Sequence, residues 1–488
     1  MTELQAVGLF GGLLLAAVGV GEGLRQLGWP GEASRRAVHA LVGLTTAASP
    51  SWFDRPRGIV ALAVVFLVAN AVARSRAWLP GVHAIGRASW GTVTFPLALL
   101  VALALCWGPV GDRVWALQVA FAVLALADPA ASLAGTRVRS PVHRVGGATK
   151  SMAGSATFAV IAFGTTASLL AALRPEPSAA AVLGAAAVVA ALATVAEALG
   201  HNGWDNLWIV LAVVVPLAWL DSLAGSVPLG LVAVGAAVAF AWATWRVRAP
   251  DGSGALAGSL LAWGLVAVGG WAWAVPALVF FVLSSALSRL GRHRKREAEA
   301  RVQKGSRRDA GQVMANGGVG LALLAASVVV ASDALYWAFV ASFAAAAADT
   351  WGTEIGTAVG GPTRRLGVGR AVPPGTSGGM SMTGTVGGVA GAASVVGPAV
   401  ALSSGLSVGA GLALVAVAVG AAALDSALGA TVQARYRAPD GALTERAEVA
   451  GHRLPLATGR AWLDNDGVNA ACTVAAAVGA LALWAAAG

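Results

Sequence analysis

The chain has 488 residues, of which 57% are hydrophobic and only 11% are charged, and its formal net charge is +10. This composition excludes an ordinary soluble domain and predicts a polytopic membrane protein. The 63 glycines suit helices that approach closely in lipid, whereas a transmembrane barrel would show short segments of alternating polarity. We therefore predict an all-α bundle of membrane-spanning helices.

Apolar runs recur along the whole chain and predict about sixteen membrane spans. They are expected at residues 5–21, 36–49, 58–73, 92–108, 114–134, 152–172, 180–199, 206–224, 228–245, 255–273, 274–290, 312–331, 334–358, 378–402, 406–430 and 469–487. With the N-terminus outside, the inner loops would hold most of the 33 Lys and Arg residues, as the positive-inside rule requires. The basic surplus then reflects topology and anionic lipids, and no nucleic-acid partner is expected.

The amino-terminal segment "MTELQ" lacks a basic region and no small-residue cleavage site follows, so we expect the first span to be retained. Cys106 and Cys472 lie in apolar stretches without metal-ligand spacing, and the six histidines are scattered, so no disulfide or histidine metal site is expected. The expected location is a prokaryotic cytoplasmic membrane, with the polar motifs on its cytoplasmic side.

Polar motifs first appear towards the end of the apolar run at 114–134. Asp128 lies in "ALADPAASLAG" (125–135), Lys150 in "GGATKSMAGSATF" (146–158), and Glu197 and Asp205 in "AEALGHNGWDNLW" (196–208). A carboxylate at the centre of a bilayer costs about 2.5–3.5 kcal/mol on insertion scales, so carboxylates at the ends of apolar helices indicate a function.

Together with "SRRAVHALVGL" (34–44), these motifs resemble the phytol kinase and dolichol kinase family over roughly residues 30–225. The chain has Ala127 and Ala153 where the family usually has a glycine and often an acidic residue. The resemblance implies phosphorylation of an isoprenoid alcohol with CTP as donor. We expect donor phosphates to contact Lys150, Ser151, Gly154 and Ser155, and Mg²⁺ or proton transfer to involve Asp128, Asp205 and Glu197.

The helix expected at 334–358 also carries carboxylates after an apolar run. Eleven residues of almost pure Phe and Ala, interrupted only by one valine and one serine, lead into Asp349, and Glu354 follows in "ADTWGTEIG". The next loop, "GPTRRLGVGRAVPPGTSGGMSMTGT" (361–385), is rich in small residues, whose backbone N–H groups with nearby arginines can bind phosphate oxygens. Mg²⁺ held by the carboxylates would complete a phosphoryl-transfer site.

Three further segments add polar side chains on the same predicted side: "RVQKGSRRDAGQVMANGG" (301–318), "ALDSALGATVQ" (423–433) and "WLDNDGVNA" (462–470). The predicted phosphate-binding residues are Lys304, Arg308, Arg364, Arg365, Arg370, Gly375, Thr376, Ser377, Gly378 and Gly379. The predicted metal ligands are Asp349, Glu354, Asp425, Asp464 and Asp466, of which Asp349, Glu354 and Asp464 are also the predicted catalytic carboxylates.

These C-terminal motifs resemble the membrane family that includes phytyl-phosphate kinase, over roughly residues 228–488. The resemblance implies that an isoprenyl monophosphate receives a second phosphoryl group from a nucleoside triphosphate. A phosphate monoester has a second pKa near 6, so this nucleophile needs no strong base. We predict two domains, a prenol kinase at 1–225 and a prenyl-phosphate kinase at 226–488, acting on a substrate such as phytol or geranylgeraniol.

The two halves also resemble each other. Asp128, "SMAGS" (151–155) and the Asp-Asn pair at 205–206 parallel Asp349, "SMTGT" (381–385) and the Asp-Asn pair at 464–465. We hypothesise that they are diverged copies of one bundle, although low complexity favours chance matches.

Two other classes of function remain open. A secondary transporter would also show embedded carboxylates and repeats, but nearer the midplane of the membrane. A cytidylyltransferase making a CDP-linked lipid would use similar nucleotide motifs. The sequence leaves open the length of the prenyl tail, the donor nucleotide and the oligomeric state.

Overall fold

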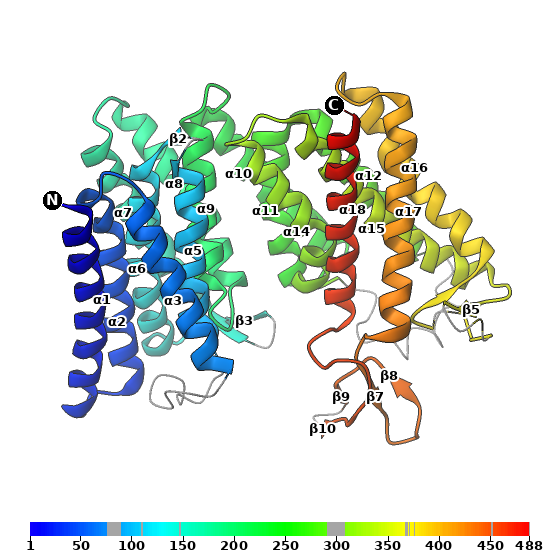
Figure 1. Cartoon of the computed structure of the whole chain (residues 1–488), viewed down its shortest axis with the longest axis horizontal. Coiled ribbons are helices and arrows are strands. Elements are labelled where there is room, and N and C mark those ends of the chain that lie inside the picture. Colours follow the sequence, from blue (N-terminus) through cyan, green and yellow to red (C-terminus); the bar gives the residue numbers. More distant parts are fainter. Residues whose placement is uncertain are drawn as a thin grey trace. The chain divides into compact units, whose positions relative to one another are not determined.

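The computed structural model describes residues 1–75, 89–108, 111–145, 148–289, 308–366, 369, 371–374, 376–449 and 452–487. Backbone contacts divide the chain into two compact units (Figure 1). The N-terminal unit comprises Met1–Gly235 and Val328–Val330, and the C-terminal unit comprises Ala236–Ser327 and Ala331–Gly488. Helix α10 (Val227–Arg246) contains the boundary between the two units.

Helices dominate the described part of the N-terminal unit. They are α1 (Glu3–Gln26), α2 (Gly31–Ala48), a short 3-10 helix (Ser49–Trp52), α3 (Arg57–Ser75), α5 (Gly91–Cys106), α6 (Val114–Arg137), α7 (Met152–Leu173), α8 (Ala179–Leu199) and α9 (Asp205–Leu220). Two antiparallel hairpins interrupt them, β1 (Trp107–Gly108) with β2 (Gly111–Asp112), and β3 (Val142–Val145) with β4 (Ala148–Ser151).

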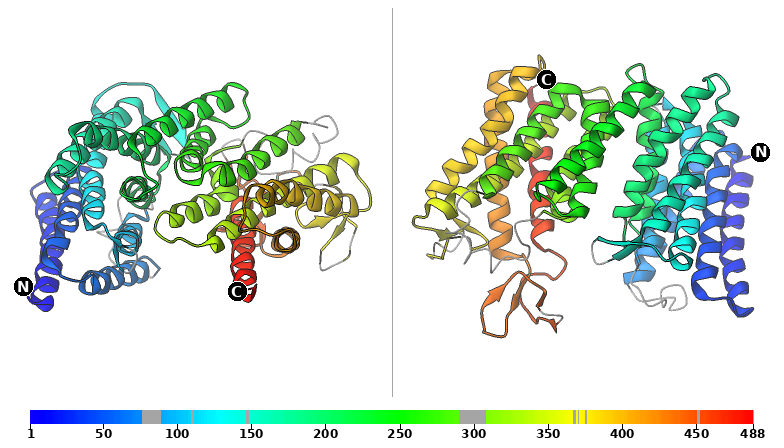
Figure 2. Two further views of the ribbon diagram at one scale, coloured as in Figure 1. Left: turned by 90° about the horizontal axis from the view of Figure 1, so that it is seen from above. Right: turned by 180° about the vertical axis from the view of Figure 1, so that it is seen from behind.

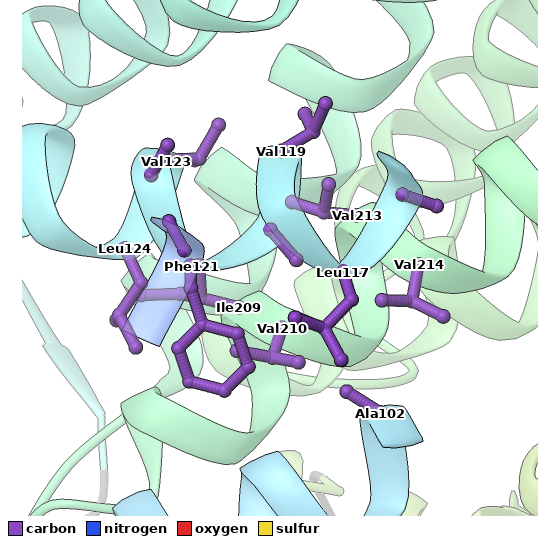
Figure 3. Close-up of a cluster of buried hydrophobic side chains, with 14 of the residues drawn as sticks. Ala102, Leu117, Val119, Phe121, Val123, Leu124, Ile209, Val210, Val213 and Val214 are labelled. Atoms are coloured by element: carbon purple, nitrogen blue, oxygen red, sulfur yellow. The ribbon is translucent and has the colours of Figure 1, made fainter. Parts of the chain in front are cut away.

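Helix α6 is the centre of this unit. Figure 3 shows its Leu117, Phe121 and Leu124 gathered with Ile209 and Val210 of α9, and all five are buried. A helix that is apolar on every side must be surrounded by other helices, and α6 accordingly packs against α2, α5, α7 and α9. This packing fixes the position of Asp128 near the C-terminal end of α6.

The C-terminal unit contains α11 (Gly252–Gly264), a π-helical turn (Leu265–Gly269), α12 (Gly270–Arg289), α14 (Ala310–Ser327), α15 (Asp333–Val359), α16 (Met382–Leu402), α17 (Val408–Thr431) and α18 (Asn465–Ala487). Its central helix is α15, which packs against α12, α14, α16, α17 and α18. Residues Tyr336 to Ala348 are all buried, because their mostly small side chains let five helices surround this segment.

Short strands lie in the loops of the C-terminal unit, and the sequence patterns did not predict them. Strand β5 (Arg364–Arg365) pairs with β6 (Gly379–Met380). A second group follows α17 and comprises β7 (Arg435–Arg437), β8 (Leu443–Thr444), β9 (Glu448–Val449), β10 (His452–Arg453) and β11 (Leu456–Thr458). Figures 1 and 2 show this group at one end of its helical bundle, beyond the ends of α17 and α18.

Ten segments of the described residues are long and apolar enough to cross a membrane. One of them, Gly252–Ser288, joins the two spans expected at 255–273 and 274–290, while α5 and α9 are apolar but shorter. The structure confirms a helical, membrane-type chain. The count of about sixteen crossings remains a prediction.

Candidate functional site

A cavity of about 370 Å³ lies in the C-terminal unit. It is bounded by α14, α15, α16, α17 and α18, by the loop before α16 and by the loop after β8. Each of the five C-terminal motifs that the sequence singled out contributes at least one residue to its wall. Residues up to 181 positions apart, from Ser288 to Asn469, therefore meet in a single space.

Four carboxylates line this cavity. Asp349 and Glu354 come from α15, Asp425 from α17 and Glu445 from the loop after β8. Asp425 feels the charges of both Asp349 and Glu445, and its Oδ2 atom is buried without a hydrogen-bond partner among the described residues. Like charges that interact in a poorly solvated space repel each other, so the arrangement favours a bound cation.

The loop before α16 supplies the small polar wall. Thr376, Ser377 and Ser381 line the cavity, and the Ser381 hydroxyl caps α16 by accepting a hydrogen bond from the Gly384 N–H at 3.1 Å. Gly378 has a φ of +76°, and a Cβ there would lie 2.6 Å from Ala430, so only glycine fits. The free N–H groups at the start of α16 and its dipole suit an anion such as phosphate.

Arg435 forms hydrogen bonds with the backbone of this loop and of α17. Its Nη2 donates hydrogen bonds to the Ser377 carbonyl oxygen at 2.8 Å and to the Gly429 carbonyl oxygen at 2.6 Å. Burial lowers the pKa of the Arg435 guanidinium, Arg365 lowers it further and Glu445 raises it. Arginine stays protonated after such shifts. Glu445 in turn accepts a hydrogen bond from the Ser377 hydroxyl, which ties the β8 loop to the cavity.

Cationic and amide side chains line another part of the wall. Arg308, Gln312 and Asn316 lie at the start of α14 or just before it, and Asn465 and Asn469 lie on α18. Burial lowers the pKa of Arg308, and the charge of Glu354 raises it. This wall can donate hydrogen bonds to phosphate oxygens, and the guanidinium can pair with them.

Several predicted residues do not line the cavity. Asp464 accepts a hydrogen bond from the Gly467 N–H at 3.0 Å and so caps the start of α18, and Asp466 also lies outside the wall. Arg364 is exposed and bonds the Gly369 carbonyl oxygen, while Arg365 bonds the Ala430 carbonyl oxygen. Asp464, Arg364 and Arg365 therefore form hydrogen bonds with backbone groups of the protein itself. Lys304, Arg370 and Gly375 lie outside the described residues.

The donor set can be compared with what Mg²⁺ requires. Among the described residues, no three His, Cys, Asp or Glu side chains gather closely enough to hold a metal by themselves. Mg²⁺ in phosphotransferases is commonly held by one or two carboxylates, with water and substrate phosphates completing its shell. Asp349 and Asp425, with the unpartnered Oδ2 of the latter, fit that requirement.

The N-terminal motifs also meet, but around an ion pair. The Lys150 Nζ atom lies 2.6 Å from Glu197 Oε1 and donates a further hydrogen bond of 2.7 Å to the Glu197 carbonyl oxygen. The Ser155 hydroxyl donates to Glu197 Oε2 at 3.4 Å. Both charged side chains are mostly shielded, with exposed fractions of 19% for Lys150 and 7% for Glu197. The Glu197 carboxylate, predicted to bind metal, is thus occupied by a lysine.

Asp128 lies beside this ion pair, within electrostatic range of Lys150, Glu197 and Asp205. His39 of α2 places its Nε2 atom 3.7 Å from Asp128 Oδ2. His39 stands in the quoted segment "SRRAVHALVGL", but 89 residues separate it from Asp128, so no local pattern predicted the contact.

Other lining residues that sequence reasoning missed are Glu445, Ser381 and Thr385. Ser381 and Thr385 stood in a quoted motif, "SMTGT", and its serine followed by glycine at the third position was a capping signal. Glu445 lies in a polar loop without any motif, so no local pattern indicated it.

Comparisons with known proteins agree with the division of the chain. Residues 235–477 match the family described as "Integral membrane protein DUF92", and this range includes every residue of the cavity wall. The chain is also similar to Protein PGR of Arabidopsis thaliana, at 28% identity over 257 residues, which cover 47% of this chain and 87% of that protein. No solved structure matches the chain.

The C-terminal half is therefore similar to an integral membrane family, and this is the phytyl-phosphate kinase-related family that its motifs indicated. The resemblance of residues 30–225 to prenol kinases stays a prediction.

Proposed function

We propose that the C-terminal unit is a phosphotransferase that converts an isoprenyl monophosphate to the diphosphate with a nucleoside triphosphate, for which we propose CTP. A phosphate oxygen of the lipid attacks the γ-phosphorus, the bond from that phosphorus to the β-phosphate oxygen breaks, and a nucleoside diphosphate leaves. The family match supports a membrane enzyme of lipid metabolism, and the finer assignment rests on the cavity.

The observation that carries this proposal is the composition of the cavity wall. Carboxylates that fit a divalent cation, a capped helix start with Ser and Thr hydroxyls, and a half-buried arginine all face one space of about 370 Å³. Phosphoryl transfer needs these groups, because its catalysis consists mainly of positioning and of neutralising negative charge.

The residues divide the work as follows. Thr376, Ser377 and the N–H groups at the start of α16 would bind donor phosphates, and Arg308 would pair with the phosphate of the lipid. When bound between Asp349 and Asp425, Mg²⁺ would neutralise phosphate charge. Asn465 and Asn469 would orient phosphate oxygens by donating hydrogen bonds.

For the N-terminal unit we propose the preceding reaction, phosphorylation of the isoprenoid alcohol. This proposal rests on the resemblance of its motifs and on the meeting of Asp128, Lys150 and Asp205 in one cluster. A membrane-embedded enzyme gains from such a substrate, because the greasy tail enters sideways from lipid while the hydroxyl stays near the headgroups. We propose that both sites face the cytoplasm.

Product analysis tests the proposal. Purified protein in detergent is incubated with CTP or ATP, Mg²⁺ and a C20 prenol, and separately with the corresponding monophosphate, and the lipids are identified by mass. We expect diphosphate from both substrates. Diphosphate from the monophosphate alone would restrict the proposal to the C-terminal unit.

Two other results would contradict it. A CDP-linked lipid with release of pyrophosphate would identify a cytidylyltransferase. No phosphorylated or nucleotide-linked lipid under any condition would remove the enzymatic proposal and favour a transporter.

A further inference from the structure

The two units use one arrangement of five helices. In the N-terminal unit α6 packs against α5, α7 and α9, and α8 packs against α7 and α9. In the C-terminal unit α15 packs against α14, α16 and α18, and α17 packs against α16 and α18. Helix α17 also packs against α15, a closer approach than that of α8 to α6. The pairs α5–α9 and α14–α18 complete the parallel, and the chain order is the same. Helices α5 to α9 therefore align with α14 to α18.

Close contacts fix the register of this alignment. A Cβ on Gly154 of α7 would lie 3.0 Å from the Ala131 carbonyl oxygen, and one on Gly384 of α16 would lie 2.8 Å from the Gly352 carbonyl oxygen. Ala131 and Gly352 each come three residues after an aspartate, Asp128 or Asp349. The aspartates of the two units therefore occupy corresponding positions.

The helix caps agree with this register. The side chains of Ser151 and Ser381 each accept a hydrogen bond of 3.1 Å from the N–H of the glycine three residues later. A Cβ on Gly135 would lie 2.8 Å from the Ser151 hydroxyl oxygen, and a Cβ on Gly356 would lie 3.1 Å from the Ser381 hydroxyl oxygen. Each of these glycines lies seven residues after the aspartate of its unit. Ser151 is the last residue of β4, and Ser381 directly follows β6, each the second strand of an antiparallel pair.

At one aligned position a charged residue of the N-terminal unit corresponds to an uncharged residue of the C-terminal unit. Lys150 and Met380 each immediately precede the capping serine, so an ammonium group in one unit corresponds to a thioether in the other. Each unit also has a carboxylate near the end of its fourth aligned helix, Glu197 on α8 and Asp425 on α17.

These two carboxylates have opposite surroundings. Glu197 is paired with Lys150 at 2.6 Å. No described Lys or Arg forms an ion pair with Asp425, its Oδ2 atom is buried without a hydrogen bond, and Asp349 adds a second negative charge. An uncompensated buried charge is unfavourable, so the C-terminal unit needs a cation where the N-terminal unit carries its own.

We propose that the Lys150 ammonium occupies, in the N-terminal unit, the position that a divalent cation takes in the C-terminal unit, so that only the C-terminal site binds such an ion. This inference deepens the proposed function and rests on it for the metal-dependent chemistry of the C-terminal site. It revises the predictions that Asp128, Glu197 and Asp205 are metal ligands.

Binding of Mn²⁺, a spectroscopic substitute for Mg²⁺, tests the exchange on the full chain. The number of ions bound by the purified protein in detergent is measured by electron paramagnetic resonance without any substrate. We expect one Mn²⁺ per wild-type chain, none for Met380→Lys, two for Lys150→Met and one for the charge-conserving Lys150→Arg.

The stoichiometries also decide against the inference. Two ions on the wild type, or unchanged numbers in both Lys150→Met and Met380→Lys, would overturn it. Size-exclusion profiles identify a variant that fails to fold, and Asp425→Asn then replaces Met380→Lys, with loss of the single ion expected and its retention contradictory. Because the readout needs no turnover, a protein that binds as expected but makes no diphosphate would contradict the proposed function alone.

Discussion

In the N-terminal unit the buried Glu197 forms an ion pair with Lys150, whereas in the C-terminal unit the corresponding Asp425 faces a cavity. Helix packing around the two groups is alike, down to the serine that caps the helix next to each one. The difference shows that one arrangement of helices can either neutralise a carboxylate with a lysine of its own or leave the carboxylate accessible to a ligand. A single residue, Lys150 or Met380, decides which of the two occurs.

The largest expected effect concerns that pairing. Glu197→Gln leaves the Lys150 ammonium without its carboxylate, and removing one partner of a buried ion pair costs about 3–5 kcal/mol. Asp425→Asn, by contrast, removes a carboxylate with an unpartnered buried oxygen and should stabilise the protein when no divalent ion is present. Unfolding in detergent with a chelator measures both. A shift of both variants in the same direction would break the comparison.

The second prediction separates arginines that the sequence treated alike. Arg308 lines the cavity, so Arg308→Gln should slow diphosphate formation about 10-fold to 150-fold, the equivalent of a lost charged hydrogen bond of about 1.5–3 kcal/mol. Arg364 is exposed and outside the wall, so Arg364→Gln is the matched control and should change the rate less than about 2-fold. Steady-state rates with the lipid monophosphate decide, and equal losses would contradict the placement of the site.

The third prediction tests the shared helix contact. Gly154→Ala and Gly384→Ala each push a methyl group to 3.0 Å or less from a backbone oxygen and should cost about 1–3 kcal/mol. Gly164→Ala and Gly397→Ala lie on the same two helices with nothing within 4 Å and should leave stability unchanged or slightly raised. Thermal midpoints of the four variants provide the measurement. Tolerance at Gly154 but not at Gly384 would show that the two contacts are not equivalent.

The smallest effect concerns the two caps. Ser151→Ala and Ser381→Ala each remove a side-chain acceptor from a helix start and should cost about 1 kcal/mol. The unfolding free energies should fall by similar amounts, while Ser→Asp at either position should restore the cap. Clearly unequal losses would show that the two caps are not equivalent and that only the helix packing corresponds between the two units.

Much of the fold followed from the sequence because long apolar runs report helices directly. The run ending at Asp349 predicted α15 to within a residue at each end, and 114–134 lies within α6. The short strands β7 to β11 escaped prediction, since strands of two or three residues are too short to show alternation. Their register depends on pairing between strands, which no local pattern carries.

The site was predictable in part, for a similar reason. Asp349, Glu354 and Asp425 interrupt apolar helices, and a buried carboxylate is visible without knowledge of its neighbours. Asp464 lies outside the cavity wall and caps α18, and its role as a metal ligand stays a prediction, because an aspartate at a helix start caps as readily as it binds metal. The contacts of His39 with Asp128 and of Arg435 with Ser377 join distant segments, and the composition of those segments is unremarkable.

The most direct test of the account is a crossed assay of two variants, Asp349→Asn and Asp128→Asn, with the prenol and the prenyl monophosphate as separate substrates. We predict that Asp349→Asn loses diphosphate formation about 100-fold or more but still makes monophosphate from the alcohol. Asp128→Asn should lose the alcohol reaction and retain the second step. Unchanged diphosphate formation by Asp349→Asn would contradict the assignment of the C-terminal cavity as the site of phosphoryl transfer.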